Sequence, residues 1–353
     1  MDIALIVPAP FATISGGYIY DRHVVGGLRA LGHTVRVIEL AGHHPLPDAE
    51  AEAAARAALD TVPEGSRIII DGLGLPSFSL LADALEARGA MGLIHHPTAL
   101  ETGFSEDDRT TLRATEQALF PRLTRIVAPS TLTARRLTEE FGIDPDRLSV
   151  VEPGTDSAPR ATGSGDETCA IISVGALIPR KGHDVLLRAV ARLTDLDWHL
   201  TIAGGARDPI HAHGLAALAA ELKIEARVTF AGECDAATLE VLYAGSDLFA
   251  LATHWEGYGM AAAEAMARGL PLAITSGGAI AEIVAPGAAI IAAPGDHAAL
   301  SRAMRRVIFD RDLRAEMAEA SWQGGQMLPR WSDRAEAFAS AMAKPASSPL
   351  AGQ

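Results

Sequence analysis

The chain has 353 residues, 48% of them hydrophobic, and this length and composition suit a globular protein of two domains. Its 44 acidic and 30 basic residues give a formal net charge of −14. An acidic surface repels phosphate backbones, so the charge disfavours a nucleic-acid-binding protein. No apolar run reaches the ~20 residues of a membrane span, and residues 1–4 lack the positive charge that begins a secretory signal. We therefore expect a cytoplasmic protein, with peripheral membrane contact left open but not favoured.

The first half of the chain alternates apolar strands with helices. An apolar run over residues 3–7 is followed by a break at Ser15-Gly16-Gly17, a helix over 18–31 and a strand over 34–40. Further strands are expected at 67–70, 91–95, 125–128 and 148–151, and helices at positions that include 108–119 and 131–141. Continuous apolar strands between amphipathic helices indicate a parallel sheet covered on both faces.

A segment rich in Pro, Gly, Ser and Thr, residues 153–166, is expected to be a linker. The alternation then restarts, with strands expected at 170–174, 199–203, 227–230, 248–251, 271–274 and 288–291, and helices at 184–193, 215–222, 236–244, 259–267, 298–309 and 334–342. The pattern predicts an α/β fold of two Rossmann-like domains, residues 1–160 and 165–325, facing each other across a cleft. Ligands of such sheets bind at the carboxyl ends of the strands.

The segment from Glu256 to Met266 carries two carboxylates and two glycines at the expected start of a helix. Gly257 and Gly259 allow close approach of the backbone, and the N–H groups of the helix start make an anion site. Glu256 and Glu264 flank this site, where sugar hydroxyls are natural partners: those of a transferred sugar for Glu256 and of ribose for Glu264. Ordinary solvated glutamates near a helix start are the alternative.

A second segment, residues 173–184, follows the first strand after the linker and places Arg180 beside Lys181. A guanidinium fork next to an ammonium group suits a diphosphate. Pro179 and Gly182 stiffen and then turn the loop. Only three of the 30 basic residues are lysines, which favours a chemical role for Lys181 over the alternative of a solvated basic loop.

These two segments, in this order, resemble the family 4 retaining glycosyltransferases of GT-B fold. The resemblance extends over nearly all of residues 1–340. Its other matches are Gly16-Gly17 with the N-terminal glycine loop, residues 93–97 with the strand-end histidine, and the segments 153–156, 230–232 and 276–278. It implies that a C-terminal helix within residues 326–343 packs back on the N-terminal domain, with residues 344–353 as a flexible tail.

The resemblance implies donor-binding roles for residues of the second half. Arg180 and Lys181 would neutralise the donor diphosphate, and the backbone at Gly259 and Met260 would add N–H donors to the same phosphates. Glu264 would bind the ribose hydroxyls.

It also implies roles at the transferred sugar. Glu256 would bind that sugar, His95 would reach its reacting face from the N-terminal domain, and Gly16 and Gly17 would cover the diphosphate. The expected catalytic residues are therefore His95, Glu256 and Lys181.

Two features of the sequence limit these assignments. Many members of the family carry Arg at the position of Ala176, so one contact to the diphosphate is missing here. On the acceptor side, His96 and Glu101 are candidates. A satisfied strand-end histidine is the favoured alternative for His96, and a surface carboxylate at a helix start explains Glu101 equally well.

A divalent metal is not expected. Asp144-Pro145-Asp146 spells the D-x-D motif that binds metal in another glycosyltransferase fold, but it lies in a polar turn between a helix and a strand, where Asp and Pro are common. The 12 histidines and two cysteines show no zinc-site spacing.

The expected function is a retaining, metal-independent glycosyltransferase without a further cofactor. It would move a sugar from a UDP- or GDP-sugar, UDP being favoured, to a small-molecule, glycan or lipid acceptor. No carboxylate is clearly placed as a nucleophile, so we expect front-face attack in which the departing phosphate oxygen takes the acceptor proton. The alternatives are a sugar-nucleotide 2-epimerase or phosphorylase of the same fold and, from another class, a two-lobed solute-binding protein, which would need export.

Overall fold

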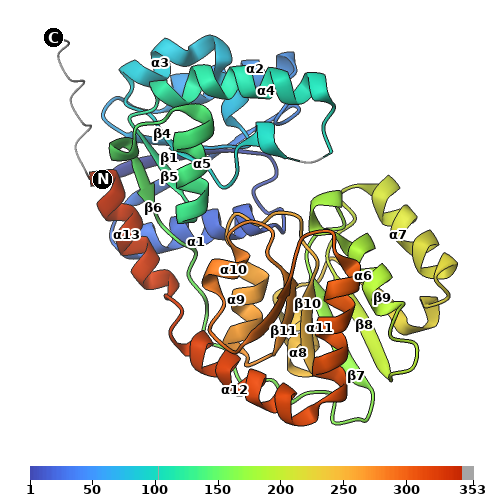
Figure 1. The fold of residues 1–353 in the computed structure, drawn as a ribbon. Coiled ribbons are helices and arrows are strands. Elements are labelled where there is room, and N and C mark those ends of the chain that lie inside the picture. The colour runs from blue at the N-terminus through green and yellow to red at the C-terminus, as the bar shows by residue number, and fades with distance from the viewer. Residues whose placement is uncertain (102, 344–353) are drawn as a thin grey trace. The chain divides into compact units, whose positions relative to one another are not determined.

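The computed structural model describes residues 1–101 and 103–343 (Figure 1). The expected tail, residues 344–353, lies outside the described residues. The chain divides into two compact units. Unit 1 is Met1–Gly154 together with the chain from Trp331, and unit 2 is Thr155–Arg330. Each unit is described separately below.

Unit 1 is built on a six-stranded parallel sheet in the order β2-β1-β3-β4-β5-β6. Its strands are β1 Asp2–Pro8, β2 Thr34–Leu40, β3 Arg67–Asp71, β4 Met91–Leu93, β5 Arg125–Ala128 and β6 Leu148–Val150. The strand order reverses between β1 and β3, which is where sheets of this kind bind ligands, beyond the carboxyl ends of the strands.

Helices cover this sheet on both faces, as the unbroken apolar strands predict (Figure 1). They are α1 Gly16–Ala30, α2 Ala49–Thr61, α3 Ala82–Ala87, α4 Glu106–Leu119, α5 Thr131–Phe141 and α13 Trp331–Ala343, with short 3₁₀ turns η1 Leu75–Leu81, η2 Thr98–Leu100, η3 Phe120–Arg122 and η4 Pro145–Arg147. One prediction at the start of α1 is wrong. Gly16 and Gly17 form the first turn of the helix rather than a break before it, because Ser15 caps the helix by accepting from the Tyr18 N–H.

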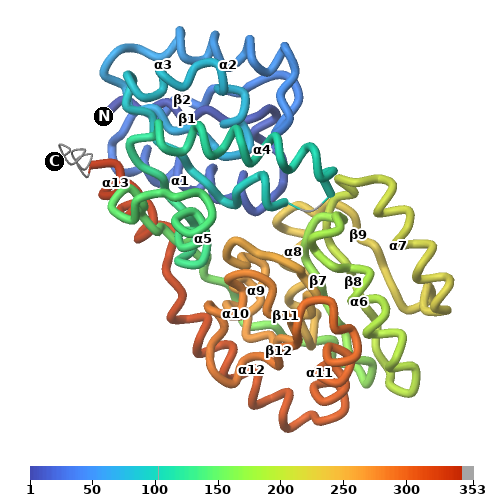
Figure 2. The backbone as a smooth tube through the Cα atoms, turned by 45° about the horizontal axis from the view of Figure 1, so that its top comes forward, coloured from blue at the N-terminus to red at the C-terminus, as the bar shows by residue number. Residues whose placement is uncertain are grey.

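The last described helix, α13, packs on α1 within unit 1 (Figures 1 and 2). The close approach depends on Gly27, because a Cβ there would overlap the Cβ of Ala335. Trp331 adds aromatic contacts at the start of α13, stacking on His23 at 4.1 Å between ring centroids and meeting Tyr20 edge-on at 5.7 Å. The prediction that a C-terminal helix returns to the N-terminal domain is therefore confirmed.

Unit 2 repeats the architecture with a parallel sheet in the order β12-β11-β10-β7-β8-β9. Its strands are β7 Cys169–Val174, β8 Trp198–Ala203, β9 Val228–Gly232, β10 Leu248–Leu251, β11 Leu272–Thr275 and β12 Ala289–Ala292. Its helices are α6 His183–Val190, α7 Pro209–Glu221, α8 Ala236–Ala244, α9 Met260–Ala267, α10 Ile280–Ile283, α11 His297–Phe309 and α12 Arg311–Gln326, with 3₁₀ turns η5 Pro179–Lys181 and η6 Glu225–Arg227.

Two features of unit 2 differ from the sequence-based expectations. The expected linker is not a free connection, because its backbone binds unit 2: the Ala161 N–H donates to Arg268 and the Thr162 N–H to Ala244. The boundary between the units consequently falls after Gly154. Helix α12, which packs on α9, was not predicted at all.

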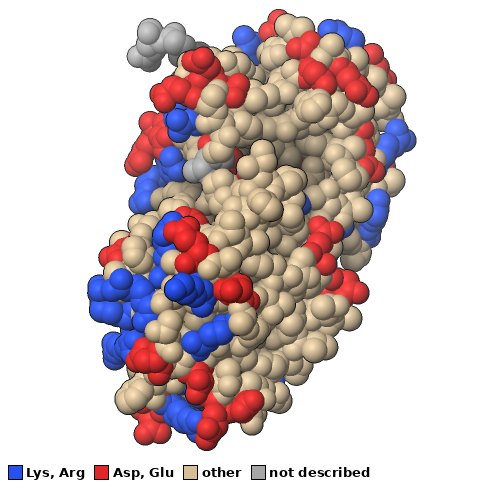
Figure 3. All heavy atoms as spheres, turned by 90° about the vertical axis from the view of Figure 1, so that its right-hand side faces the viewer, with Lys and Arg blue, Asp and Glu red and all other residues tan. Residues whose placement is uncertain are grey.

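Charges of both signs are interspersed on the face of the molecule shown in Figure 3, rather than gathered in one basic surface. Within the described part of the chain, no helix has the length and apolarity needed to cross a bilayer.

Candidate functional site

The predicted donor-binding residues of unit 2 follow two adjacent strands, β7 and β10. Arg180 and Lys181 lie in the loop after β7, and Gly259, Met260 and Glu264 lie at and within the helix α9 that follows β10. After β10 the chain runs to Gly259, which caps α9 in the left-handed conformation with φ 112°. A Cβ at this position would lie 2.9 Å from the Cγ1 of Ile280, so glycine is required for both backbone and space. The first N–H groups that form hydrogen bonds at this helix end are those of Ala262 and Ala263, and both donate to the Gly259 carbonyl. The N–H groups of Met260 and Ala261 precede them at the helix end, where an anion is stabilised.

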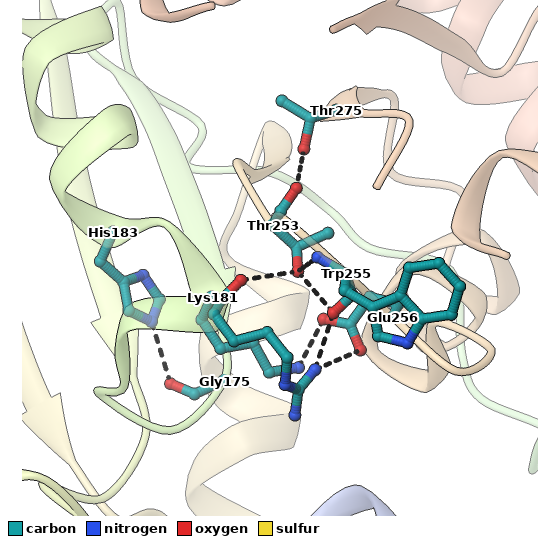
Figure 4. Close-up of polar contacts among 8 residues, drawn as sticks. Gly175, Lys181, His183, Thr253, Trp255, Glu256 and Thr275 are labelled. Atoms are coloured by element: carbon teal, nitrogen blue, oxygen red, sulfur yellow. Dashed lines mark hydrogen bonds and ion pairs between the residues drawn. The ribbon is translucent and has the colours of Figure 1, made fainter. Parts of the chain in front are cut away.

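Lys181 and Glu256 form a largely buried ion pair beside this helix end (Figure 4). The Lys181 Nζ lies 2.6 Å from the Glu256 Oε1, and the two side chains are 16% and 10% exposed. Arg180 lies next to the pair, with its NH1 2.7 Å from the Trp255 carbonyl and 3.9 Å from the Glu256 Oε2. Burial raises the pKa of Glu256, but Lys181 and Arg180 outweigh it, so the pKa falls below its usual value and the carboxyl is ionised.

The loop that carries Glu256 is fixed by backbone and hydroxyl contacts. The Thr275 hydroxyl donates to the Thr253 carbonyl at 2.6 Å, and the Glu256 N–H donates to the Gly277 carbonyl at 3.0 Å (Figure 4 shows the threonine contact). A Cβ on Gly277 or Gly278 would overlap the backbone of residues 253–256. The glycines after β11 therefore serve to let the loop after β10 pack directly against them.

Glu264 lies one turn into α9 and accepts a hydrogen bond from the Tyr243 hydroxyl at 3.1 Å. Burial raises its pKa, against the opposing effects of Tyr243 and Arg268. Arg268 also pairs with Glu240, which anchors the guanidinium at the end of α9. Glu264 therefore has a protein partner of its own in Tyr243.

His183 was not predicted as a site residue, although it belongs to the same segment as Arg180 and Lys181. It is fully buried, and its Nε2 lies 3.2 Å from the Gly175 carbonyl (Figure 4). Burial and, secondarily, Lys181 lower its pKa to about 4, so it is neutral and ties the loop after β7 to α6. Its position directly after the Lys181-Gly182 turn is the sequence signal that could have identified it.

In unit 1, His95 follows β4 and forms a cluster with two carboxylates that were not predicted. The His95 Nε2 lies 2.9 Å from the Asp21 Oδ1 and 3.7 Å from the Asp71 Oδ2. One carboxylate oxygen of each aspartate and one ring nitrogen of His95 all lie within 4.8 Å of one another. Gly17 makes room for the ring, since a Cβ there would be 3.1 Å from the His95 Cδ2. Gly17 and His95, both predicted, are thus brought together, with Gly16 preceding them in the first turn of α1.

The segment after His95 carries the two acceptor-side candidates, His96 and Glu101, both of them half-buried. A buried carboxylate from α4, Glu116, holds this segment: it accepts from the Thr98 N–H at 2.6 Å, the Thr98 hydroxyl at 2.8 Å and the Ala99 N–H at 3.1 Å. Sequence reasoning missed Glu116 because its partners lie 17 and 18 residues away and on another element.

Asp144 and Asp146 lie in the turn that was expected for them. The Asp144 side chain caps η4 by accepting from the Asp146 N–H at 2.9 Å. The predicted residues as a whole fall into two groups: Gly16, Gly17, His95, His96 and Glu101 in unit 1, and Arg180, Lys181, Glu256, Gly259, Met260 and Glu264 in unit 2.

The paired Rossmann-like units have the fold of GT-B glycosyltransferases. The structure is similar to a sucrose-phosphate synthase from Thermosynechococcus elongatus, with a TM-score of 0.81 at 18% identity, covering 96% of this chain and 98% of that chain. It is also similar to WaaG, a glycosyltransferase of lipopolysaccharide biosynthesis, with a TM-score of 0.78 at 18% identity, covering 97% of this chain and 100% of that chain. A third similar structure is Anabaena HepE in complex with UDP and glucose, with a TM-score of 0.76 at 16% identity, covering 98% of this chain and 100% of that chain.

The family match lies in unit 2. Residues 155–323, nearly all of unit 2, match the model of the family described as "Glycosyl transferases group 1". Curated relatives include the D-inositol 3-phosphate glycosyltransferases of Thermomonospora curvata and Nocardia farcinica. The first is 32% identical over 209 residues, covering 51% of this chain and 48% of the relative. The second is 33% identical over 214 residues, covering 56% and 48%. The chain thus spans about half the length of these relatives.

Proposed function

We propose that the protein is a retaining glycosyltransferase that transfers a sugar from a nucleoside-diphosphate sugar, with UDP as the favoured nucleotide. The observation that carries the proposal is the cationic pair Arg180 and Lys181 held against Glu256 beside the start of α9. Two cations and a helix N-terminus at the carboxyl edge of a parallel sheet make a diphosphate site. UDP is favoured because the structurally similar HepE is solved with UDP and with UDP-glucose.

The chemistry would divide among these residues as follows. Arg180, Lys181 and the N–H groups at Met260 would stabilise the negative charge that develops on the leaving diphosphate. Glu256, ionised and already placed, would accept hydrogen bonds from hydroxyls of the transferred sugar. In front-face transfer the departing phosphate oxygen takes the proton of the acceptor hydroxyl as the new glycosidic bond forms, so no covalent sugar–enzyme intermediate arises. His95 would contribute the polar group of unit 1 at the transferred sugar.

Glu264 is proposed to bind the ribose, with the Tyr243 hydroxyl holding the carboxylate in place. The acceptor would meet the segment that carries His96 and Glu101 and that Glu116 fixes. Because curated relatives are named D-inositol 3-phosphate glycosyltransferases, that compound belongs in the first panel of acceptors. We further propose that no metal ion takes part, since the charged groups above serve the leaving diphosphate directly, and that the protein acts in the cytoplasm.

The test uses the full-length chain with a set of UDP- and GDP-sugars and an acceptor panel of inositol phosphates, simple sugars and lipid headgroups. A transferase releases nucleoside diphosphate at a rate that depends on the acceptor, and NMR of the product should show the anomeric configuration of the donor. An inverted product would refute the retaining mechanism. Release of diphosphate without any acceptor dependence would favour an epimerase, and binding of a sugar without nucleotide would favour a solute-binding protein.

A further inference from the structure

A cluster of two carboxylates and one imidazole lies at the carboxyl edge of the unit 1 sheet, next to the strand-order reversal. Asp21 comes from α1, Asp71 is the last residue of β3, and His95 follows β4. Asp21 and Asp71 are 1% and 5% exposed, whereas the His95 side chain keeps 22% exposure. The carboxylates are therefore sealed behind the histidine, and the histidine is the member of the cluster that a ligand can reach.

Both carboxylates lie close to the same ring nitrogen, the Nε2 of His95. The His95 Nε2 donates to the Asp21 Oδ1 at 2.9 Å, and the Asp71 Oδ2 stands 3.7 Å from the same atom. The Asp71 Oδ1 is occupied by the Leu73 N–H at 2.9 Å. Within residues 1–101 and 103–343, the Asp21 Oδ2 has no hydrogen-bond partner although it is buried. An N–H on Nε2 leaves Nδ1 as the ring atom that can meet a substrate.

The ring is held on its other sides as well. Gly17 lies against the Cδ2 edge, and Tyr20 packs edge-on at 5.1 Å between ring centroids with an interplanar angle of 79°. Tyr20 is itself fixed, because its hydroxyl donates to the Val151 carbonyl at 2.9 Å. The orientation of the imidazole is thus determined by contacts from α1 and β3 before any substrate arrives.

The charges around the ring are predominantly negative. Asp21 from α1 and Asp71 from β3 face it directly, and the neighbouring His96 follows it in the chain. Tyr20 stays neutral because burial, followed by Asp21, raises its pKa far above the usual range. Arg334 of α13 has an opposing, smaller effect on Tyr20, and its NH1 lies 3.9 Å from the Glu152 Oε2. Two buried carboxylates against one imidazole favour a proton on both ring nitrogens.

We infer that Asp21 and Asp71 are positioning residues that hold His95 as an imidazolium, anchored through Nε2, so that its Nδ1–H is a fixed hydrogen-bond donor to an oxygen of the substrate. The inference deepens the proposed function and rests on it for the identity of that substrate. It assigns to unit 1 a charged hydrogen-bond donor rather than a general base.

The titration behaviour of the groups agrees with the geometry. Burial alone lowers the pKa of His95, but Asp21 and then Asp71 outweigh it, and the net shift is upward. Burial and the charge of Asp21 raise the pKa of Asp71 to about 7. The cluster therefore retains a proton near neutral pH.

The test is an NMR titration of the full-length protein labelled on histidine, with the His95 signal assigned by its loss in His95→Gln. In the wild type the His95 signal should titrate above pH 6.5. Asp21→Asn should lower the proton affinity of His95 at least tenfold, a downward shift of one pH unit or more. Asp71→Asn should lower it less, because Asp71 lies farther away. Asp60→Asn, an exposed residue of α2 in the same unit, is the matched control and should change nothing.

Three results would overturn the inference: a wild-type His95 that titrates at or below pH 6.5, an unchanged titration in folded Asp21→Asn, or stoichiometric Zn²⁺ binding that Asp21→Asn abolishes. If Asp21→Asn does not fold, the shift in Asp71→Asn decides. The measurement needs no substrate, so it is independent of the proposed activity. If the transferase activity is found, the limb of the kcat/KM profile that falls at high pH should move to lower pH in Asp21→Asn, whereas a purely structural defect would lower kcat/KM at every pH.

Discussion

The ion pair of Lys181 and Glu256 leads to an unusual prediction: removing the Glu256 charge should tighten the binding of bare UDP. In the structure the ammonium group is already engaged by the carboxylate at 2.6 Å. A diphosphate that binds Lys181 must compete with Glu256 for it, and it leaves a largely buried carboxylate without its partner. In Glu256→Gln this competition is reduced to that of a neutral amide.

The size of the effect follows from the difference between the two contacts. A hydrogen bond to a charged group contributes about 1.5–3 kcal/mol and a neutral one about 0.5–1.5 kcal/mol. Glu256→Gln should therefore bind UDP more tightly by about 1–2 kcal/mol, or roughly five- to thirtyfold. For a UDP-sugar the gain should be smaller, because the sugar hydroxyls give the wild-type carboxylate new donors that compensate its separation from Lys181.

The assay is isothermal titration calorimetry of UDP and of UDP-glucose on folded wild type and Glu256→Gln. Glu319→Gln serves as the matched control, because Glu319 is an ion-paired glutamate of unit 2 on α12, partnered by Arg160 and half exposed. The reasoning is refuted if Glu256→Gln binds UDP no better than wild type, or if UDP and UDP-glucose gain equally.

Four further outcomes are expected. Glu264→Gln should weaken UDP binding about tenfold if its carboxylate binds the ribose, since a charged contact becomes neutral, and calorimetry with UDP against free phosphate checks this. Transfer activity should survive EDTA; its loss, restored by Mn²⁺ or Mg²⁺, would contradict a metal-free mechanism. Glu116→Gln should lower the free energy of unfolding by about 1.5–3 kcal/mol, because an amide oxygen cannot replace a carboxylate that accepts three hydrogen bonds, as urea denaturation would measure. Because the pKa of Asp71 is raised on folding, the contribution of this one carboxyl to the stability of the wild type falls as pH rises from 3.8 to about 7. Asp71→Asn should lack this loss, so its stability relative to wild type should be higher at pH 8 than at pH 4, by at most about 4 kcal/mol. Equal differences at both pH values would count against the buried carboxyl.

The strands and most helices could be predicted from the sequence because their cores are apolar runs of ordinary length. The strand β10 and the helix α8 begin and end at the predicted residues. Helix α12 could not be recognised in this way. Its buried positions, Met317, Ser321 and Gly325, are mostly small, and a Cβ on Gly325 would overlap the Met266 carbonyl. A helix that packs through small residues carries no hydrophobic periodicity.

The site residues likewise divide into those that the sequence could identify and those that it could not. Arg180, Lys181 and Glu256 stand in two short segments whose turns and glycines can be read directly. The cluster of Asp21, Asp71 and His95 joins three elements that are distant in sequence, so no local pattern indicates it. Asp71 ends an apolar strand, and that was a usable signal, since charged residues at the carboxyl ends of neighbouring parallel strands meet at one edge. Asp21, inside a helix, offered none.

The return of α13 to unit 1 has a consequence for the order in which the protein can be completed during synthesis. Unit 2 is one continuous stretch, so all of its contacts are available once Arg330 has left the ribosome. The contacts of unit 1 are completed later, because the surface of α1 around Gly27 stays uncovered until residues 331–343 emerge from the ribosome. Trp331 then packs on Tyr20, the residue that supports the His95 ring. A nascent chain stalled before residue 331 would thus hold a completed unit 2, while unit 1 would still lack the Trp331 contact to Tyr20 beside His95.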